Sequence, residues 1–270
     1  MPQAVKTPDI NITGNKSSFF FIFVDLSLIR RIFTSKAAKN YISITIIEAK
    51  NTLVYSKLSM KKKIIILVIA TALIVGITFL GGMLVPSIEN IVLKRIATVS
   101  FNLCNGAVAL ISIKLTGIKI GIELKNYLQF VIGLGITLVL SLSLAFIPAW
   151  CGHSLVGSHT NYYIATLIYA FFFYLLVIGP VEEMVFRVYY QETFMSFFSK
   201  HKWIGVIISS ALFGLWHLIN GSFVQALFTF GIGLVFGFAK YFIKQYKYLG
   251  LAFSHGLYDF LNVVVTMFVI

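Results

Sequence analysis

A series of long apolar segments constrains this chain more than any other feature of its sequence. A helix needs about 20 apolar residues to cross a bilayer, and seven segments after residue 60 approach or exceed that length. These segments are Ile64 to Val85, Ile91 to Ile113, Leu128 to Trp150, Tyr162 to Ile178, Trp203 to Ile219, Phe223 to Ala239 and Tyr248 to Ile270. The pattern predicts an all-α fold, a polytopic transmembrane helical bundle with about seven spans.

Composition supports a membrane protein and argues against a nucleic-acid binder. The chain is 59% hydrophobic and only 11% charged, whereas soluble domains are about 25% charged. Its net charge of +13 is divided among short basic clusters between the apolar segments. A nucleic-acid binder concentrates such charge on one face or arm. We therefore expect the lipid bilayer to be a partner and nucleic acid not to be one. No disulfide is expected between Cys104 and Cys151, the only cysteines.

The basic clusters predict an orientation, because short loops rich in Lys and Arg stay cytoplasmic. They occupy every second connection: Lys61 to Lys63; Lys114, Lys119 and Lys125; Lys200 and Lys202; Lys240, Lys244 and Lys247. The alternate connections, Cys151 to Asn161 and Asn220 to Ser222, contain neither Lys nor Arg. This places the start of the first span in the cytoplasm and the C-terminus outside. Lys94 and Arg95 are exceptions, for which snorkelling to a lipid head group is the available explanation.

Residues 1–59 differ from the rest and carry no recognisable motif. Their apolar stretch, Ser17 to Ile29, contains Asp25 and is too short to cross a bilayer. Met60 is followed by three lysines and a long apolar run. We expect 1–59 to be a non-core N-terminal extension and Met60 to be the native start, which an intact-mass measurement would test. A cleaved signal peptide at Lys61 to Val85 is the alternative, although its apolar run exceeds a typical h-region.

Charged residues cluster in Gly179 to Gln191, which reads GPVEEMVFRVYYQ. Charges at membrane depth are costly and usually functional. On a helix, Glu183 and Arg187 are four residues apart with the acid first, which favours an ion pair. Glu182 is offset by about 100°, so it can face a cavity and act as a general base. A salt-bridged helix end at the membrane surface is the alternative explanation.

Two further pairs occur at the same spacing. Phe213 and His217 are four residues apart in one apolar segment, and His255 and Asp259 are four apart in another. A single buried histidine is commonly a hydrogen-bonded packing residue, and a nearby Asp can simply satisfy it. Glu182, His217, His255 and Asp259 on three segments nevertheless form a plausible water-activating or metal-binding group.

Taken in order, these three pairs resemble a known family. The patterns are Glu182-Glu183-x-x-x-Arg187, Phe213-x-x-x-His217 and His255-x-x-x-Asp259. They are similar to the motifs of the CAAX protease and bacteriocin-processing family of intramembrane endopeptidases, also written CPBP or Abi. The resemblance covers about residues 162–270 and implies a catalytic core there, after N-terminal transmembrane helices at 60–161, with the active site buried between helices. The family's third motif often ends in Asn, whereas this chain has Asp.

The resemblance implies hydrolysis of a peptide bond within the membrane. Glu182 would activate a water as general base, and His217 would share or orient that water. His255 and Asp259 would stabilise the oxyanion, although an ionised Asp cannot donate a hydrogen bond. Asp259 must therefore be protonated or must orient His255. Structural support would come from Glu183, Arg187 and Phe213.

The sequence leaves the cofactor open. The H-E-x-x-H helix of zinc peptidases is absent. Glu182, His217 and His255 could still form a three-ligand zinc site with water in the fourth position. The resemblance favours the metal-free glutamate mechanism.

The expected partner is a peptide or membrane-protein substrate, and the expected location is a bacterial cell membrane. One alternative is a non-catalytic bacteriocin self-immunity or scaffold protein of the same fold. A second is a proton-coupled transporter that uses the intramembrane Glu and His as a relay. The transporter is less favoured because the sequence shows no inverted repeat.

The depth of the candidate residues is a difficulty for this interpretation. At about 1.5 Å per residue, His217 lies ~22 Å beyond Lys202, whereas His255 lies only ~10 Å beyond Lys247. Helix tilt, a wide cavity or a helix break at Gly179-Pro180 could bring the residues to one level.

Overall fold

The computed structural model describes residues 58–153, 163–219 and 221–268. These residues lie in one compact unit, Asn51–Ile270, whereas residues 1–57 of the predicted extension lie outside the described part. Within the described ranges all regular structure is helical. The α-helices are α3 (Met60–Leu84), α4 (Ile91–Thr116), α5 (Leu128–Ser141), α6 (Ile147–Trp150), α7 (Ile164–Phe173), α8 (Gly179–Glu183), α9 (Gln191–Phe197), α10 (Trp203–Trp216), α11 (Phe223–Phe242) and α12 (Tyr248–Phe268). Three π-helical segments are η1 (Leu142–Phe146), η2 (Tyr174–Ile178) and η3 (Met184–Tyr190).

Six helical stretches are long and apolar enough to cross a membrane. They are Met60–Leu84, Ile91–Thr116, Leu128–Trp150, Ile164–Phe197, Phe223–Phe242 and Tyr248–Phe268. A seventh apolar helix, α10, has only 14 residues and is about 21 Å long, shorter than the predicted span from Trp203 to Ile219. The structure thus confirms an all-α, polytopic membrane protein, with one helix too short for a full crossing.

The helix break at Gly179-Pro180, one of the three explanations considered for the difference in depth, is absent. Helical structure continues for 34 residues from Ile164 to Phe197. Directly before Gly179-Pro180 the helix has the π-helical hydrogen-bond pattern of η2. There the Gly179 N–H bonds the Tyr174 carbonyl, five residues back. A proline interrupts the hydrogen-bond ladder of a helix, but a π-segment can accommodate such a defect without breaking the helix.

Side chains from other helices bind carbonyl groups of this long helix. The Ser209 hydroxyl donates to the Phe186 carbonyl at 2.5 Å, and Lys240 Nζ donates to the Arg187 carbonyl at 2.6 Å. The Tyr248 hydroxyl donates to the carbonyl of Pro180 at 3.0 Å. Neighbouring polar groups of this kind are what stabilise irregular helices within membranes.

A close contact of two glycines joins the long helix to α12. A Cβ atom on Gly179 would meet the Gly256 amide nitrogen at 2.7 Å, and one on Gly256 would meet the Leu175 Cα at 2.8 Å. The two backbones therefore touch directly, as small residues permit between membrane helices. This contact brings the carboxylates of α8 beside the middle of α12.

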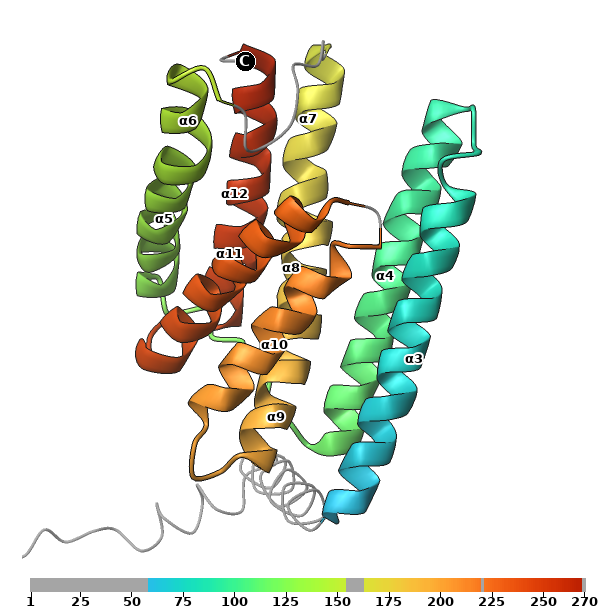
Figure 1. Ribbon diagram of the computed structural model, residues 1–270, viewed down its shortest axis with the longest axis vertical. Helices are drawn as coiled ribbons and strands as arrows, with labels where there is room; N and C mark the ends of the chain where they lie inside the picture. The colour runs from blue at the N-terminus through green and yellow to red at the C-terminus, as the bar shows by residue number, and fades with distance from the viewer. Residues whose placement is uncertain (1–57, 154–162, 220, 269–270) are drawn as a thin grey trace, which may run out of the picture. The chain divides into compact units, whose positions relative to one another are not determined.

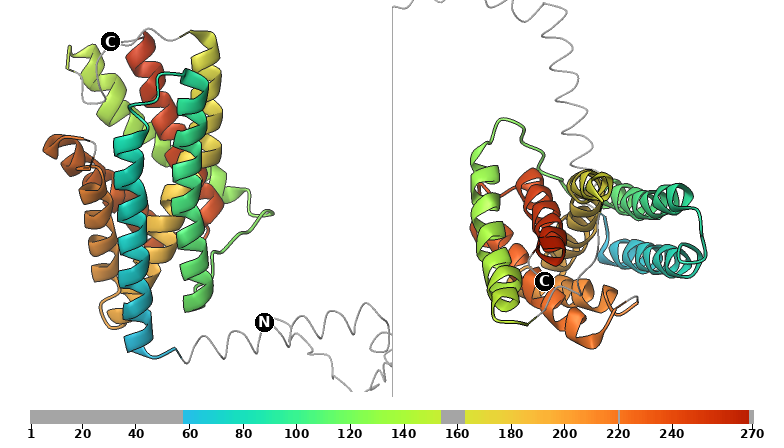
Figure 2. Two further views of the ribbon diagram at one scale, coloured as in Figure 1. Left: turned by 90° about the vertical axis from the view of Figure 1, so that its right-hand side faces the viewer. Right: turned by 90° about the horizontal axis from the view of Figure 1, so that it is seen from above.

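The arrangement of the helices accounts for the apparent difference in depth. In Figure 1 the α11–α12 turn lies nearer the middle of the bundle than the α9–α10 turn. The α10–α11 hairpin also ends well short of the level reached by the start of α7 and the end of α12, as Figure 2 shows. Because α10 and α12 begin at different levels, counting residues from Lys202 and Lys247 does not compare depths.

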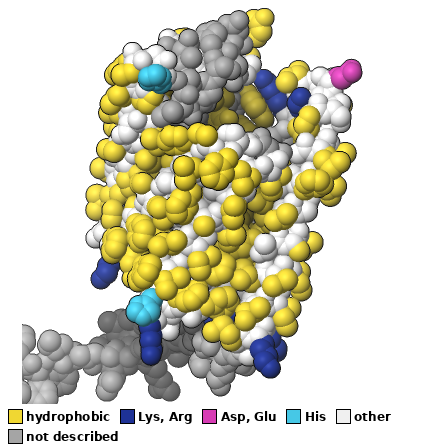
Figure 3. Space-filling model, in the orientation of Figure 1, with side chains coloured by type: hydrophobic (Ala, Val, Ile, Leu, Met, Phe, Trp, Pro, Cys, Tyr) yellow, Lys and Arg dark blue, Asp and Glu magenta, His cyan; other side chains and the backbone are white. Residues whose placement is uncertain are grey.

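The surface is consistent with a multi-pass integral membrane protein. On the face seen in Figure 3, hydrophobic side chains cover the middle, and Lys and Arg side chains lie towards the two ends. Arg95, an exception to the predicted charge pattern, stacks over the Tyr169 ring at 4.3 Å and donates to Thr166. It therefore has partners on α7. Both cysteines are free.

Candidate functional site

The seven residues singled out in the sequence come from three parts of the bundle. Glu182 and Glu183 end α8, and Arg187 follows in η3; Phe213 lies in α10, and His217 directly follows that helix; His255 and Asp259 lie in α12. The glycine contact between the long helix and α12 sets the distance between the carboxylates and His255.

His255 is the centre of the arrangement. Its Nδ1 lies 2.8 Å from Glu183 Oε1. Its Nε2 lies 3.4 Å from Glu182 Oε2 and 3.5 Å from Asp259 Oδ2. One imidazole ring thus contacts three carboxyl groups, two of which share the same nitrogen.

The Nδ1 side of His255 is completely buried. The side chains of Glu183 and Arg187 are both 0% exposed, and their ion pair joins Oε2 to Nε at 3.6 Å. The Arg187 guanidinium also lies 4.6 Å above the centre of the Phe213 ring, a favourable cation–π position. The expected pairing of Glu183 with Arg187 is present. Glu183 has a second role that sequence reasoning missed, because it also binds His255.

The Nε2 side is more accessible. The Glu182 side chain is 15% exposed and that of Asp259 is 22% exposed. Glu182 is therefore the more accessible of the two neighbouring glutamates, and it contacts the opposite nitrogen of the ring from Glu183. Asp259 approaches Nε2 and not Nδ1, so the residue that can fix the ring through its other nitrogen is Glu183.

His217 joins this group through an aromatic ring. Its Nδ1 lies 2.9 Å from the Phe213 carbonyl oxygen. A proton on Nδ1 would be donated to that oxygen, which leaves Nε2 with a lone pair. Phe213 packs edge-on against the rings of both His217 and His255, with centroid distances of 5.0 and 5.5 Å. Within the described part of the chain, no hydrogen bond or ion pair joins His217 to Glu182 or His255.

Phe236 of α11 is a further contact that sequence reasoning missed. Its ring is completely buried, and its centroid lies 5.6 Å from that of His255. No spacing pattern distinguishes it from the other phenylalanines of its segment. Phe213 and Phe236 together provide an apolar surrounding for the imidazole.

A zinc site formed by Glu182, His217 and His255 remains a prediction. Among the described residues, no group of three or more His, Cys, Asp and Glu side chains has an arrangement that could hold a metal ion. Of the three residues, His255 and Glu182 are close, with Nε2 3.4 Å from Oε2.

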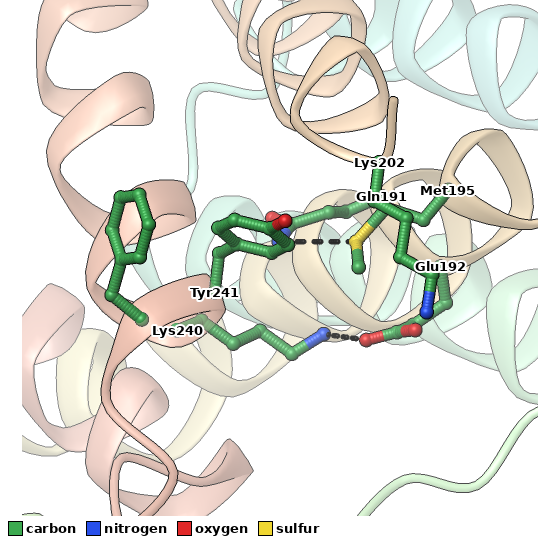
Figure 4. A pocket seen from close by; sticks show the side chains of 7 residues that line it. Gln191, Glu192, Met195, Lys202, Lys240 and Tyr241 are labelled. Atoms are coloured by element: carbon green, nitrogen blue, oxygen red, sulfur yellow. Dashed lines mark hydrogen bonds and ion pairs between the residues drawn. The ribbon is translucent and has the colours of Figure 1, made fainter. Parts of the chain in front are cut away.

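A pocket of about 480 Å³ lies between α9, α10 and α11. Figure 4 shows Lys240 and Glu192 in its wall, with Nζ 2.5 Å from Oε1. The same Nζ binds the Arg187 carbonyl. None of the seven predicted site residues lines this pocket.

Comparison with protein-family models gives one match. Residues 164–261 match the model described as "Type II CAAX prenyl endopeptidase Rce1-like". The matched range begins with α7, ends within α12 and contains all seven predicted site residues. Comparisons with curated proteins and with solved structures found no match.

Proposed function

We propose that this chain, whose residues 164–261 match the model described as "Type II CAAX prenyl endopeptidase Rce1-like", is an intramembrane endopeptidase. It hydrolyses a peptide bond of a membrane-associated peptide or protein, in a bacterial cell membrane. The observation that carries the proposal is the placement of Glu182, Glu183 and Asp259 around His255.

Glu182 is the proposed general base. Its carboxylate is the accessible one of the α8 pair, and a positioned base of this kind accelerates hydrolysis by about 10²- to 10⁴-fold. It takes a proton from water as the water oxygen attacks the carbonyl carbon. The same proton then passes to the leaving nitrogen when the C–N bond breaks. His217, with its Nε2 lone pair, orients the attacking water.

His255 and Asp259 stabilise the oxyanion in this proposal. Glu183 accepts the Nδ1 proton of His255 and fixes the ring, so a proton on Nε2 can be donated to the oxyanion. Asp259 donates only in its protonated form. Because Nε2 has two carboxyl neighbours at 3.4 and 3.5 Å, a proton shared among these groups avoids two adjacent unpaired negative charges.

A cleavage assay in isotopically labelled water tests this proposal. The full chain is reconstituted in liposomes with a library of single-span membrane peptides in H₂¹⁸O, and products are identified by mass spectrometry. We expect fragments with one ¹⁸O in the new carboxyl group, and none from Glu182→Gln protein. The metal chelator 1,10-phenanthroline should leave the yield unchanged.

The assay also separates the alternatives. Equal product from the Glu182→Gln protein would contradict the catalytic role of Glu182, and loss of product with the chelator would contradict the metal-free mechanism. A bacteriocin-immunity or scaffold protein would give no fragment and would keep its function in Glu182→Gln. A transporter would give proton-gradient-driven uptake without fragments.

A further inference from the structure

A second pocket, of about 460 Å³, lies between α3, α4 and the end of α10. Thr78, Thr98, Asn102, Asn105 and Trp216 contribute to its wall, together with glycines of α3 and apolar side chains. No charged side chain is among the residues that line it. Its size is within the range of about 300–1,000 Å³ that is usual for ligand sites.

Two residues of the pocket are close, along the chain or through a neighbouring contact, to members of the candidate active site. Trp216 directly precedes His217 and packs edge-on against Phe186, with a centroid distance of 5.7 Å. Asn105 directly precedes Gly106, where an added Cβ would meet a Val181 methyl group at 3.2 Å. Val181 in turn precedes Glu182, so the pocket residue Trp216 directly precedes His217, and the pocket residue Asn105 is linked to Glu182 through the contact of Gly106 with Val181.

The polar groups of the wall are neutral amides and hydroxyls. Asn105 is 4% exposed; its Nδ2 donates to Thr78 Oγ1 at 3.0 Å, and its Oδ1 has no partner among the described residues. Rotating the amide by 180° would exchange these atoms but would still leave one end unpaired. Asn102 Nδ2 donates to the Thr98 carbonyl at 2.9 Å, which leaves its Oδ1 available as an acceptor.

We propose that this pocket binds the uncharged main chain of the substrate beside the scissile bond, an inference that rests on the proposed endopeptidase function. A peptide bond must leave its helix before it can be hydrolysed, and its freed N–H and C=O groups then need partners inside the bilayer. Neutral amides and hydroxyls supply donors and acceptors without a charge. A lipid acyl chain would leave the buried Asn105 amide unsatisfied.

Disulfide cross-linking tests this proposal without requiring cleavage. The background is Cys104→Ser, Cys151→Ser and Glu182→Gln in the full chain, with Thr98→Cys as the pocket reporter. The control is Leu103→Cys, which is on α4 but outside the pocket and 52% exposed. The probe is a single-span peptide with Gly-Pro-Gly in the middle of its apolar helix and one Cys beside it. The matched peptide has Ala-Ala-Ala in place of Gly-Pro-Gly.

We expect a disulfide adduct at Thr98→Cys with the interrupted peptide, and about tenfold less when Asn102→Leu removes a hydrogen bond. Ser100→Ala, an exposed neighbour, should not change the yield. Equal adducts with both peptides, as a nonspecific apolar site would give, or equal adducts at Leu103→Cys, would overturn the proposal. The proposal would also be overturned if the Thr98→Cys protein kept its unfolding temperature but formed no adduct.

The result is distinguishable from failure of the proposed function. A pocket adduct without any cleavage by the Glu182 protein would reject the enzyme and keep the binding site. Cleavage without a pocket adduct would reject the binding site and keep the enzyme. Where cleavage occurs, Asn102→Leu should raise KM about tenfold at unchanged kcat, and a fall in kcat alone would contradict main-chain binding.

Discussion

The two nitrogens of His255 face different surroundings. On the Nδ1 side, Glu183 and Arg187 are completely buried and packed against Phe213. On the Nε2 side, Glu182 and Asp259 retain access to the surface. One side of the ring is therefore completely enclosed, and the other side is partly accessible. Adjacent residues of one helix supply both sides, because Glu182 and Glu183 point about 100° apart.

The largest effect on stability should come from removing Arg187. Arg187→Met leaves Glu183 as a buried carboxylate without its cation, which should lower the free energy of unfolding by about 3–5 kcal/mol. The measurement is unfolding in detergent, with Lys247→Met as matched control. Lys247 forms an exposed ion pair with Glu123, and its loss should cost about 0–1 kcal/mol. Similar losses in the two variants would show that the Nδ1 side is not the supporting one.

A second comparison concerns the Nε2 side. Asp259→Ala removes a candidate oxyanion donor and should lower kcat by about 10²- to 10³-fold. Asp259→Asn keeps a donor of similar shape and should stay within about tenfold of the original kcat. Unfolding temperatures, measured alongside, should not separate the two variants. If the Asp259→Asn variant were as inactive as Asp259→Ala, Asp259 would act through its negative charge and not as a hydrogen-bond donor.

The smallest effect should come from the contact that links α12 to the long helix. Tyr248→Phe removes the hydrogen bond to the Pro180 carbonyl, which should cost about 1 kcal/mol of unfolding free energy. Tyr241→Phe, a half-buried tyrosine of α11, is the matched control and should have a smaller effect. A loss equal to that of Arg187→Met would indicate that Tyr248 has a much larger structural role.

Much of the fold was predictable from the sequence because the bilayer imposes strict requirements. Apolar segments of sufficient length identified the spans, since every backbone polar group in lipid must be paired within its helix. The continuity of the helix through Gly179-Pro180 was not predictable. It depends on π-segments and on donors such as Lys240, which is 53 residues from the carbonyl that it binds. The end of α10 at Trp216, inside an apolar run, had no local signal either.

The site was predictable where its contacts are local. The spacing of four residues correctly gave the Glu183–Arg187 pair and placed His255 near Asp259. The bond between Glu183 and His255 joins residues 72 positions apart, and it arises from the packing of Gly179 on Gly256. No periodicity within one segment can indicate such a contact. For the same reason the sequence could not identify Phe236 or the pocket beside Trp216.

The central claim is that the two neighbouring glutamates of α8 have different roles, and a paired measurement on Glu182→Gln and Glu183→Gln tests it most directly. Each variant is purified, and its kcat and unfolding temperature are compared with those of the original protein. We predict that Glu182→Gln loses about 10²- to 10⁴-fold in kcat at an unchanged unfolding temperature, whereas Glu183→Gln has a clearly lower unfolding temperature. A Glu182→Gln protein that keeps its kcat, or that unfolds as early as Glu183→Gln, would contradict the account.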